Sequence, residues 1–177
     1  MKKIILTVFA VTSLLLYSTQ AFALLSVSVG MPMGHTITDK TIHLAGYDAP
    51  SGYLIGVQLP FAVGLGMDSY KTKLKESEAK LGTDMYNIFY QLPIPVINLI
   101  IGLGTGNQAL ECDGCADVFD KGSATQWYTS IGMPLIPLFD IHLSYRSITS
   151  KNINIKASDT KLDFSGSVTG VGIAFNF

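Results

Sequence analysis

The sequence predicts an all-β protein, an eight-stranded antiparallel up-and-down β-barrel that spans a membrane and follows an N-terminal signal peptide. Three observations predict this fold. Apolar residues alternate with small or polar residues in eight segments, which is the period of a strand with two different faces. The connections between these segments alternate between short proline turns and long polar loops. The chain is 48% hydrophobic and 14% charged, yet after residue 23 it has no run of about 18 apolar residues that could form a membrane helix.

Composition excludes several classes of protein. The 177 residues suffice for one domain of ordinary size. The apolar fraction excludes disorder, and a net charge of −1 argues against nucleic-acid binding. A soluble domain normally has about a quarter of its residues charged, so the composition is also unusual for a soluble enzyme.

The first 23 residues have the pattern of a secretory signal peptide. Lys2 and Lys3 precede an apolar stretch over residues 4–17, and Ala21 and Ala23 form an A-x-A cleavage site. The alternative is a membrane anchor, for which the apolar stretch is short. We therefore expect a signal peptide over 1–23 and a mature barrel over 24–177, with a mature charge of 10 − 13 = −3.

The first four predicted strands each have one continuous apolar face. In residues 25–31, Leu, Val and Met alternate with Ser and Gly. In residues 53–59, Tyr, Ile, Val and Leu alternate with Leu, Gly and Gln. In residues 61–68, Phe, Val, Leu and Met alternate with Ala, Gly and Asp. In residues 86–92, Tyr, Ile, Tyr and Leu alternate with Asn, Phe and Gln.

The last four predicted strands continue this alternation. In residues 97–104, Ile and Leu alternate with Asn, Ile and Gly. In residues 126–133, Trp, Thr, Ile and Met alternate with Gln, Tyr, Ser and Gly. In residues 139–146, Phe, Ile, Leu and Tyr alternate with Asp, His, Ser and Arg. In residues 170–177, Val, Ile and Phe alternate with Gly, Ala and Asn.

The connections separate the two ends of the predicted barrel. Three are short and carry prolines, which lack a ladder donor and suit strand ends: Pro60, Pro93, Pro95, Pro134 and Pro137. The other four are long and polar: 34–50, 71–83, 106–124 and 149–164. An even strand count with short turns at one end and long loops at the other is typical of a bacterial outer-membrane barrel. A secreted β-sandwich, the alternative, would not separate loop lengths so regularly.

The orientation of such a barrel follows from these loop lengths. Both termini and the proline turns are expected in the periplasm, and the four long loops outside. Tyrosine and tryptophan rings suit the membrane interface, and four lie at the loop ends of the predicted strands: Tyr53, Tyr86, Trp127 and Tyr145.

The C-terminal strand carries the most specific pattern. Gly172, Phe175 and the terminal Phe177 form a glycine followed by two alternating aromatics. This resembles the C-terminal signal of bacterial outer-membrane proteins, which the barrel-assembly machinery reads. The mature chain is similar to the small eight-stranded barrels, a class that includes adhesins, lipid-modifying enzymes and proteins of unknown role. The resemblance implies a fold and not a function.

The predicted lumen face combines glycines with a polar network. Phe89, Tyr128 and Arg146 are expected to lie over inward glycines. The ionisable and hydroxyl groups expected there are Asp68, Asp140, His142, Ser144 and Arg146. Buried charges need partners, so Arg146 should pair with Asp140 or Asp68. A narrow cavity for a small hydrophobic molecule is the alternative to tight packing.

His142 and Ser144 are the candidate catalytic residues. This His-x-Ser pair resembles the histidine and serine of barrel-type lipid A deacylases. Tyr145 stands where that family has asparagine, and no glutamate follows Glu111 to orient the histidine. Because the pair faces inward while a lipid substrate lies outside, the expectation is that the protein is not an enzyme.

Cys112 and Cys115 in the third long loop are expected to form a local disulfide, because the chain is exported. A thioredoxin-type site would want a helix after the first cysteine, and the sequence indicates none. His35 and His43 are expected in another loop and are poor zinc ligands for this pair. No metal or other cofactor is expected.

The second loop, Lys71 to Lys80, is rich in lysine, which could bind lipopolysaccharide phosphates. Overall, we expect a monomeric, non-enzymatic outer-membrane protein. Its expected partners are membrane lipids, lipopolysaccharide and the barrel-assembly machinery, and not nucleic acid. A passage for small molecules and a lipid A hydrolase are the alternatives.

Overall fold

The computed structural model describes residues 25–38, 46–60, 62–75, 79–92, 94, 97–136, 138–151, 153–156 and 161–177. The predicted signal peptide with Ala21 and Ala23 lies outside the described residues, as do His43, Pro93, Pro95 and Pro137. Eight long strands are present: β1 (Ser26–Ile37), β2 (Ser51–Gln58), β3 (Val63–Lys73), β4 (Lys80–Leu92), β5 (Asn98–Glu111), β6 (Gly122–Ile136), β7 (Phe139–Ser150) and β10 (Gly166–Asn176). A small hairpin of β8 (Ile153–Asn154) and β9 (Lys161–Leu162) and a one-turn helix, α3 (Cys115–Val118), lie in the loops.

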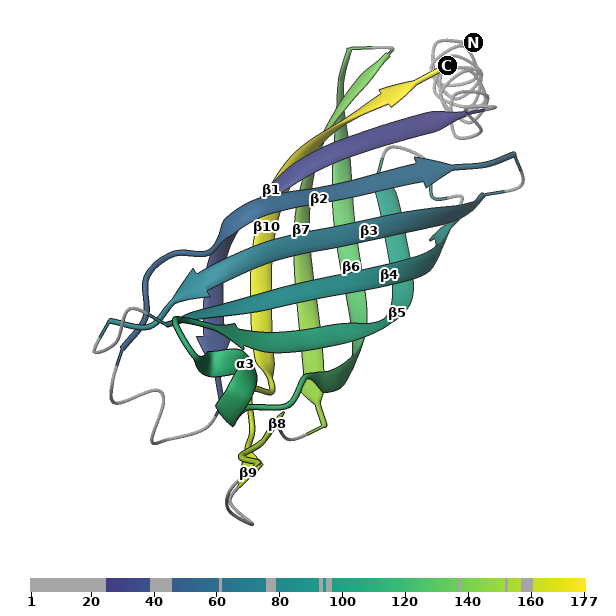
Figure 1. Ribbon diagram of the computed structural model, residues 1–177. Helices are drawn as coiled ribbons and strands as arrows, with labels where there is room; N and C mark the ends of the chain where they lie inside the picture. The colour runs from purple at the N-terminus through teal and green to yellow at the C-terminus, as the bar shows by residue number, and fades with distance from the viewer. Residues whose placement is uncertain are drawn as a thin grey trace, which may run out of the picture.

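The long strands form a closed barrel in the order β1-β10-β7-β6-β5-β4-β3-β2 (Figure 1). Every neighbouring pair is antiparallel, and β1 closes the barrel against β10. The backbone N–H of Phe177 donates to the carbonyl of Leu25 at 2.8 Å, so the first and last described residues lie side by side. The predicted eight-stranded up-and-down barrel is confirmed. None of the helices in the described part of the chain is long and apolar enough to cross a membrane.

The strands bury one face and expose the other, as the alternation predicts. In β7, for example, the side chains of Asp140, His142 and Ser144 are buried while Ile141 and Leu143 are exposed. The exposed rows of all eight strands together make a continuous apolar belt around the barrel. A polar lumen inside an apolar belt is the arrangement that a bilayer stabilises.

The strands are longer at the loop end than the sequence suggested. β3 and β4 run to Lys73 and from Lys80, and β5 runs to Glu111. The expected loops 71–83 and 106–124 are therefore too long. The loops are only the segments between these strands. The expected loops 34–50 and 149–164 are also shorter, because β1 and β7 extend into them. The sequence also placed only Asp68, Asp140 and Arg146 inside strands. That was wrong, because six more charged residues lie in strands: Lys71, Lys73, Lys80, Asp84 and Glu111 in the long strands and Lys161 in β9.

This error arose because the outward-facing residues change from apolar to polar before the strands end. Above Tyr86 in β4 the next outward residue is Asp84, and above Trp127 in β6 it is Thr125. The tyrosines and the tryptophan therefore mark where the apolar belt ends, and not where the strands end. The ladders continue beyond them, since Lys73 still pairs with Lys80 and Lys80 with Glu111.

A β-bulge changes the phase of β1. Pro32 pairs with Gly170 and Gly34 with Thr169, so Met33 is an extra residue. The bulge turns His35 and Ile37 into the lumen, where simple alternation would have placed them outside. The expectation that His35 lies in a loop is therefore wrong, because its side chain is buried in β1 and its Nδ1 contacts Thr72 Oγ1 at 2.8 Å.

Candidate functional site

An ion pair between Asp68 of β3 and Arg146 of β7 crosses the middle of the lumen. Arg146 Nε donates to Asp68 Oδ2 at 2.9 Å, and Nη2 donates to Oδ1 at 3.2 Å. Asn87 and Gln126 also donate to Oδ2, at 2.9 and 2.7 Å. The guanidinium lies 4.9 Å from the centre of the Tyr128 ring. It is therefore this ring that Arg146 covers, and not a glycine as expected. A buried carboxylate with four donors is well satisfied and holds the two sides of the barrel together.

Asp140 belongs to a second polar cluster, near the turn end. Its Oδ2 accepts hydrogen bonds from Asn98 and from Asn176, the latter at 2.8 Å. Gln91 in turn donates to Asn98 Oδ1 at 2.9 Å. The predicted lumen residues are thus divided between two clusters, and Arg146 is in the one that contains Asp68.

His142 and Ser144, the candidate catalytic pair, contact different partners. His142 Nδ1 lies 3.3 Å from Ser130 Oγ, and its Nε2 lies 3.9 Å from Asp140 Oδ2. Ser144 Oγ donates to the carbonyl of Gly170 at 3.2 Å and accepts from Arg146 Nη1 at 2.6 Å. Nucleophilic catalysis needs the serine hydroxyl to reach the histidine base, and here Ser144 instead hydrogen-bonds within the ion-pair cluster. Both side chains are buried inside the lumen.

Several residues of these clusters were missed by the sequence analysis: Asn87, Asn98, Gln126, Ser130 and Asn176. All are uncharged, and attention to ionisable groups passed over them. Their inward parity on neighbouring strands was the signal that could have found them.

Small cavities lie inside the barrel among the described residues. One of about 60 Å³ is lined by residues that include Asp68, Phe89, Tyr128 and His142. Another, of about 10 Å³, lies nearer the turn end, beside Asp140. A pocket that binds a small molecule is usually about 300–1,000 Å³. These cavities are of the size that holds a few water molecules.

Aromatic rings fill the centre of the lumen between the polar groups. Phe89 and Tyr128 pack edge to face with their ring centres 6.4 Å apart. Each covers an inward glycine on a neighbouring strand, Phe89 over Gly64 and Tyr128 over Gly102. The small residues of the lumen face are thus filled by large ones, as the sequence analysis expected for these two rings.

Two apolar layers close the loop end of the lumen. The first takes one buried side chain from each of six strands: Leu54, Tyr70, Met85, Ala124, Ile148 and Val168. Above it, Ile37 and Leu81 pack against Ile153 and Phe164 from the fourth loop region. Phe119 of the third loop forms an isolated bridge with Ile155. The described loops therefore fold over the mouth of the barrel.

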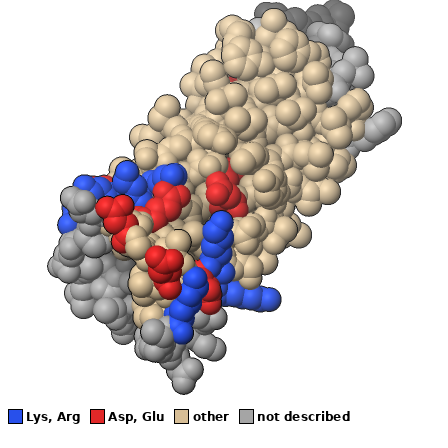
Figure 2. All heavy atoms as spheres, viewed as in Figure 1, with Lys and Arg blue, Asp and Glu red and all other residues tan. Residues whose placement is uncertain are grey.

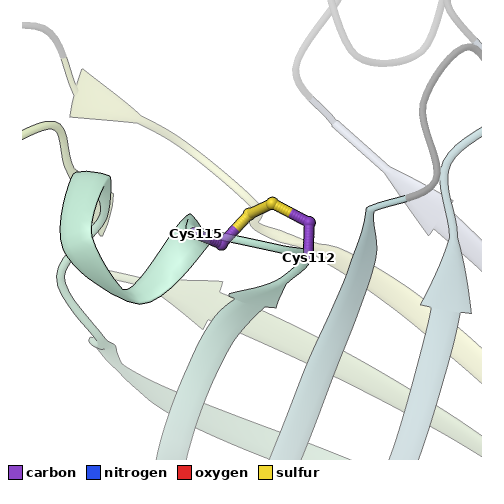
Figure 3. Close-up of a disulfide and its surroundings, with 2 residues drawn as sticks. All are labelled: Cys112 and Cys115. Atoms are coloured by element: carbon purple, nitrogen blue, oxygen red, sulfur yellow. A yellow bond between two sulfur atoms is a disulfide. The ribbon is translucent and has the colours of Figure 1, made fainter.

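The third loop contains the two cysteines (Figure 3). Cys112 and Cys115 lie at disulfide distance, with their Cα atoms 5.1 Å apart. The sequence indicated no helix here, but Cys115 begins α3, a single turn. Lys156 of the fourth loop donates from Nζ to the carbonyl of Ala116 at 2.7 Å, which ties the two loops together.

Charged side chains gather at the loop end of the barrel, and the rest of the visible face is almost free of them (Figure 2). On the outer wall, Lys71 Nζ lies 2.6 Å from Glu111 Oε2. The two residues face each other across Gly82 of β4, which has no side chain to separate them. Both are exposed above the apolar belt, where the hydrogen bond to Glu111 raises the pKa of Lys71. Lys73 and Lys80 extend this wall patch.

No protein-family model matches the sequence, and no curated protein matches it significantly. Among solved structures, the chain is similar to Neisserial surface protein A, with a TM-score of 0.58 and 11% identity over 86% of this chain and 96% of that one. It is also similar to the Yersinia pestis outer membrane protein Ail in a phospholipid bilayer nanodisc, with a TM-score of 0.50 and 16% identity over 86% and 98% of the two chains. At these identities the likeness concerns the fold alone. The barrel class suggested by the C-terminal strand is confirmed at that level.

Proposed function

We propose that this chain is an integral outer-membrane protein of a Gram-negative bacterium, a monomer without enzymatic activity, whose loop end contacts the cell exterior. The observation that carries the proposal is a lumen filled across its width by side chains, inside a barrel with an apolar outer belt. The termini and turns lie in the periplasm and the charged loops outside. Folding in the cell depends on the barrel-assembly machinery.

The filled lumen also weighs against a passage for small molecules. Among the described residues, the cavities hold about 60 and 10 Å³, and the apolar layers lie between them and the loop end. A small hydrophobic molecule would have to displace the Asp68–Arg146 pair to cross. The separation of Ser144 from His142 weighs in the same way against a lipid A hydrolase.

The proposal is tested by fractionating the envelope of an expressing Gram-negative cell and by assaying the purified barrel. The protein should be found in the outer membrane and should migrate differently with and without heating. Reconstituted barrel should give no conductance and should release no fatty acid from lipopolysaccharide. Fatty-acid release by the wild type that is lost in His142→Ala/Ser144→Ala would overturn the non-enzymatic part.

Lipopolysaccharide is the partner that the outer wall best fits. Lys71, Lys73 and Lys80 point outward above the apolar belt, on the side where the lipid headgroups of the outer leaflet carry phosphates. Replacing the three lysines by glutamine should reduce binding of lipopolysaccharide to the folded barrel. The control replaces Lys121, Lys151 and Lys156, which lie in the loops, and should leave binding nearly unchanged.

A further inference from the structure

The turn end of the barrel exposes a patch of apolar side chains. Past the point where β5 begins, the end of β6 and the turn before β7 expose Met133, Leu135, Ile136 and Leu138, with Leu135 64% and Ile136 56% accessible. Among the described residues near this end, Asp140 is the charged side chain that lies nearest, and it is buried in the lumen. A water-soluble surface rarely exposes so continuous an apolar patch.

This patch is continuous with the lipid-facing belt. β5 begins at Asn98, which pairs with Gly132, so β6 continues past its described neighbour as part of a projecting hairpin. Both faces of this projection are exposed: Pro134 is exposed although it pairs with the buried Asp140, and after the register shift at Leu135 the exposed Ile136 pairs with Phe139. The outward row runs from Ile131 to Met133 and continues past the extra residue Leu135 to Ile136 without a polar residue.

The length of the apolar belt also draws attention to the turn end. A membrane-spanning strand needs about 9–11 residues. Counted from the aromatic boundary, β2 supplies six residues (Tyr53 to Gln58), β4 seven (Tyr86 to Leu92) and β7 seven (Tyr145 back to Phe139). Only the turns can supply the remaining few residues of apolar depth on these strands.

Proline suits a turn in such a place. An unpaired backbone N–H is costly where water is scarce, and proline has none. Pro60 lies in the β2–β3 turn, and Pro134 lies on the projecting edge of β6. Neither residue has a backbone N–H that would need a hydrogen-bond partner where water is scarce.

We infer that the turn end is immersed in the inner leaflet of the membrane, and that phospholipid, and not periplasmic water or another protein, covers Leu59 and the β6–β7 hairpin. This inference rests on the proposed outer-membrane function. The barrel would then sit asymmetrically, with its strands standing out of the membrane at the loop end and its turns buried at the other.

Nitroxide labels on single cysteines test this depth. The labels are placed at Leu59→Cys and Leu135→Cys, in a Cys112→Ser/Cys115→Ser background, with the barrel in vesicles of phosphatidylethanolamine and phosphatidylglycerol. Leu143→Cys is the mid-belt control and Ser123→Cys the aqueous control, since both side chains point outward. Collision rates are measured with oxygen, which concentrates in hydrocarbon, and with a nickel chelate, which stays in water.

The turn labels should collide mainly with oxygen, as at Leu143, and not mainly with nickel, as at Ser123. Nickel-dominated collisions at both turn sites would overturn the inference. Shielding from both reagents would also overturn it, since it would mean that a second copy covers the turns. Leu138→Cys replaces Leu135→Cys should that variant not fold. If the Leu143 label itself meets nickel, the barrel is not in the bilayer and the proposed function fails instead.

Discussion

Phe89 occupies the space that a side chain on Gly64 would need. A Cβ placed on Gly64 would lie 2.1 Å from Phe89 Cζ, and one on Gly102 would lie equally close to Tyr128 Cε1. The barrel is thus filled by pairing large inward residues with glycines on the adjacent strand. Each pair is a single packing unit, and both members must be changed together to keep it.

Gly64→Ala should therefore destabilise the barrel by about 1–3 kcal/mol, the usual effect of overpacking. Combining it with Phe89→Leu should cost less than the sum of the two single changes, because the smaller side chain makes room. Urea unfolding of the reconstituted barrel measures both. The outward neighbour change Val63→Ala is the control, and strict additivity would contradict the pairing.

Asp68→Asn should lower the free energy of unfolding by about 3–5 kcal/mol, because it leaves the buried Arg146 without its counter-charge. Adding Arg146→Met should recover part of the loss. The same unfolding assay applies. Asp84→Asn, on the exposed wall with a 2.6 Å hydrogen bond from Ser69, should change stability by less than about 1 kcal/mol. Equal losses at both positions would argue against the role given to the ion pair.

Deleting Phe177 should impair assembly in cells far more than the stability of folded protein. Its side chain is 69% exposed, so the folded barrel loses little packing with it. The resemblance of the terminal strand to an assembly signal predicts the larger effect. The amount of heat-modifiable protein in the outer membrane is the measurement, with refolding in detergent as its control. Normal membrane levels of the truncated protein would refute this.

Cys112 and Cys115 should be oxidised in protein isolated from the envelope, and their double serine variant should still insert. A loop closed over so few residues restricts little of the unfolded chain, so only a modest loss of stability is expected. Thiol alkylation followed by mass spectrometry, without reductant, measures the oxidation state. Two free thiols would contradict the prediction.

Sequence alternation was enough to predict the barrel and the direction of most side chains. Period-two patterns record which face meets lipid, and in β7 Ile141 and Leu143 faced outward as expected. The strand ends could not be found in this way. Above the membrane the outward face of a strand is polar, so residues such as Lys71 and Asp84 look like loop residues in the sequence although their ladders continue.

The polar clusters were predicted only in outline. Inward parity identified Asp68, Asp140 and Arg146, but parity does not tell which of two acids an arginine on another strand will meet. That depends on the stagger between strands, which brings Arg146 to Asp68 across 78 residues of sequence. The amide partners Asn87 and Gln126 carry no charge pattern that would distinguish them from solvent-facing residues.

The extra residue at Met33 has a consequence for insertions and deletions. Within a regular strand, adding or removing one residue reverses which of the following side chains meet lipid. β1 already contains one extra residue, Met33, and the inward and outward side chains after it alternate in the opposite phase to those before it. A homologue that lacks Met33 would form a regular strand in which His35 and Ile37 keep their partners and still face the lumen. A one-residue gap at Met33 is therefore compatible with an unchanged polarity pattern on both sides of it, whereas a one-residue gap within a regular strand reverses the faces of the residues that follow.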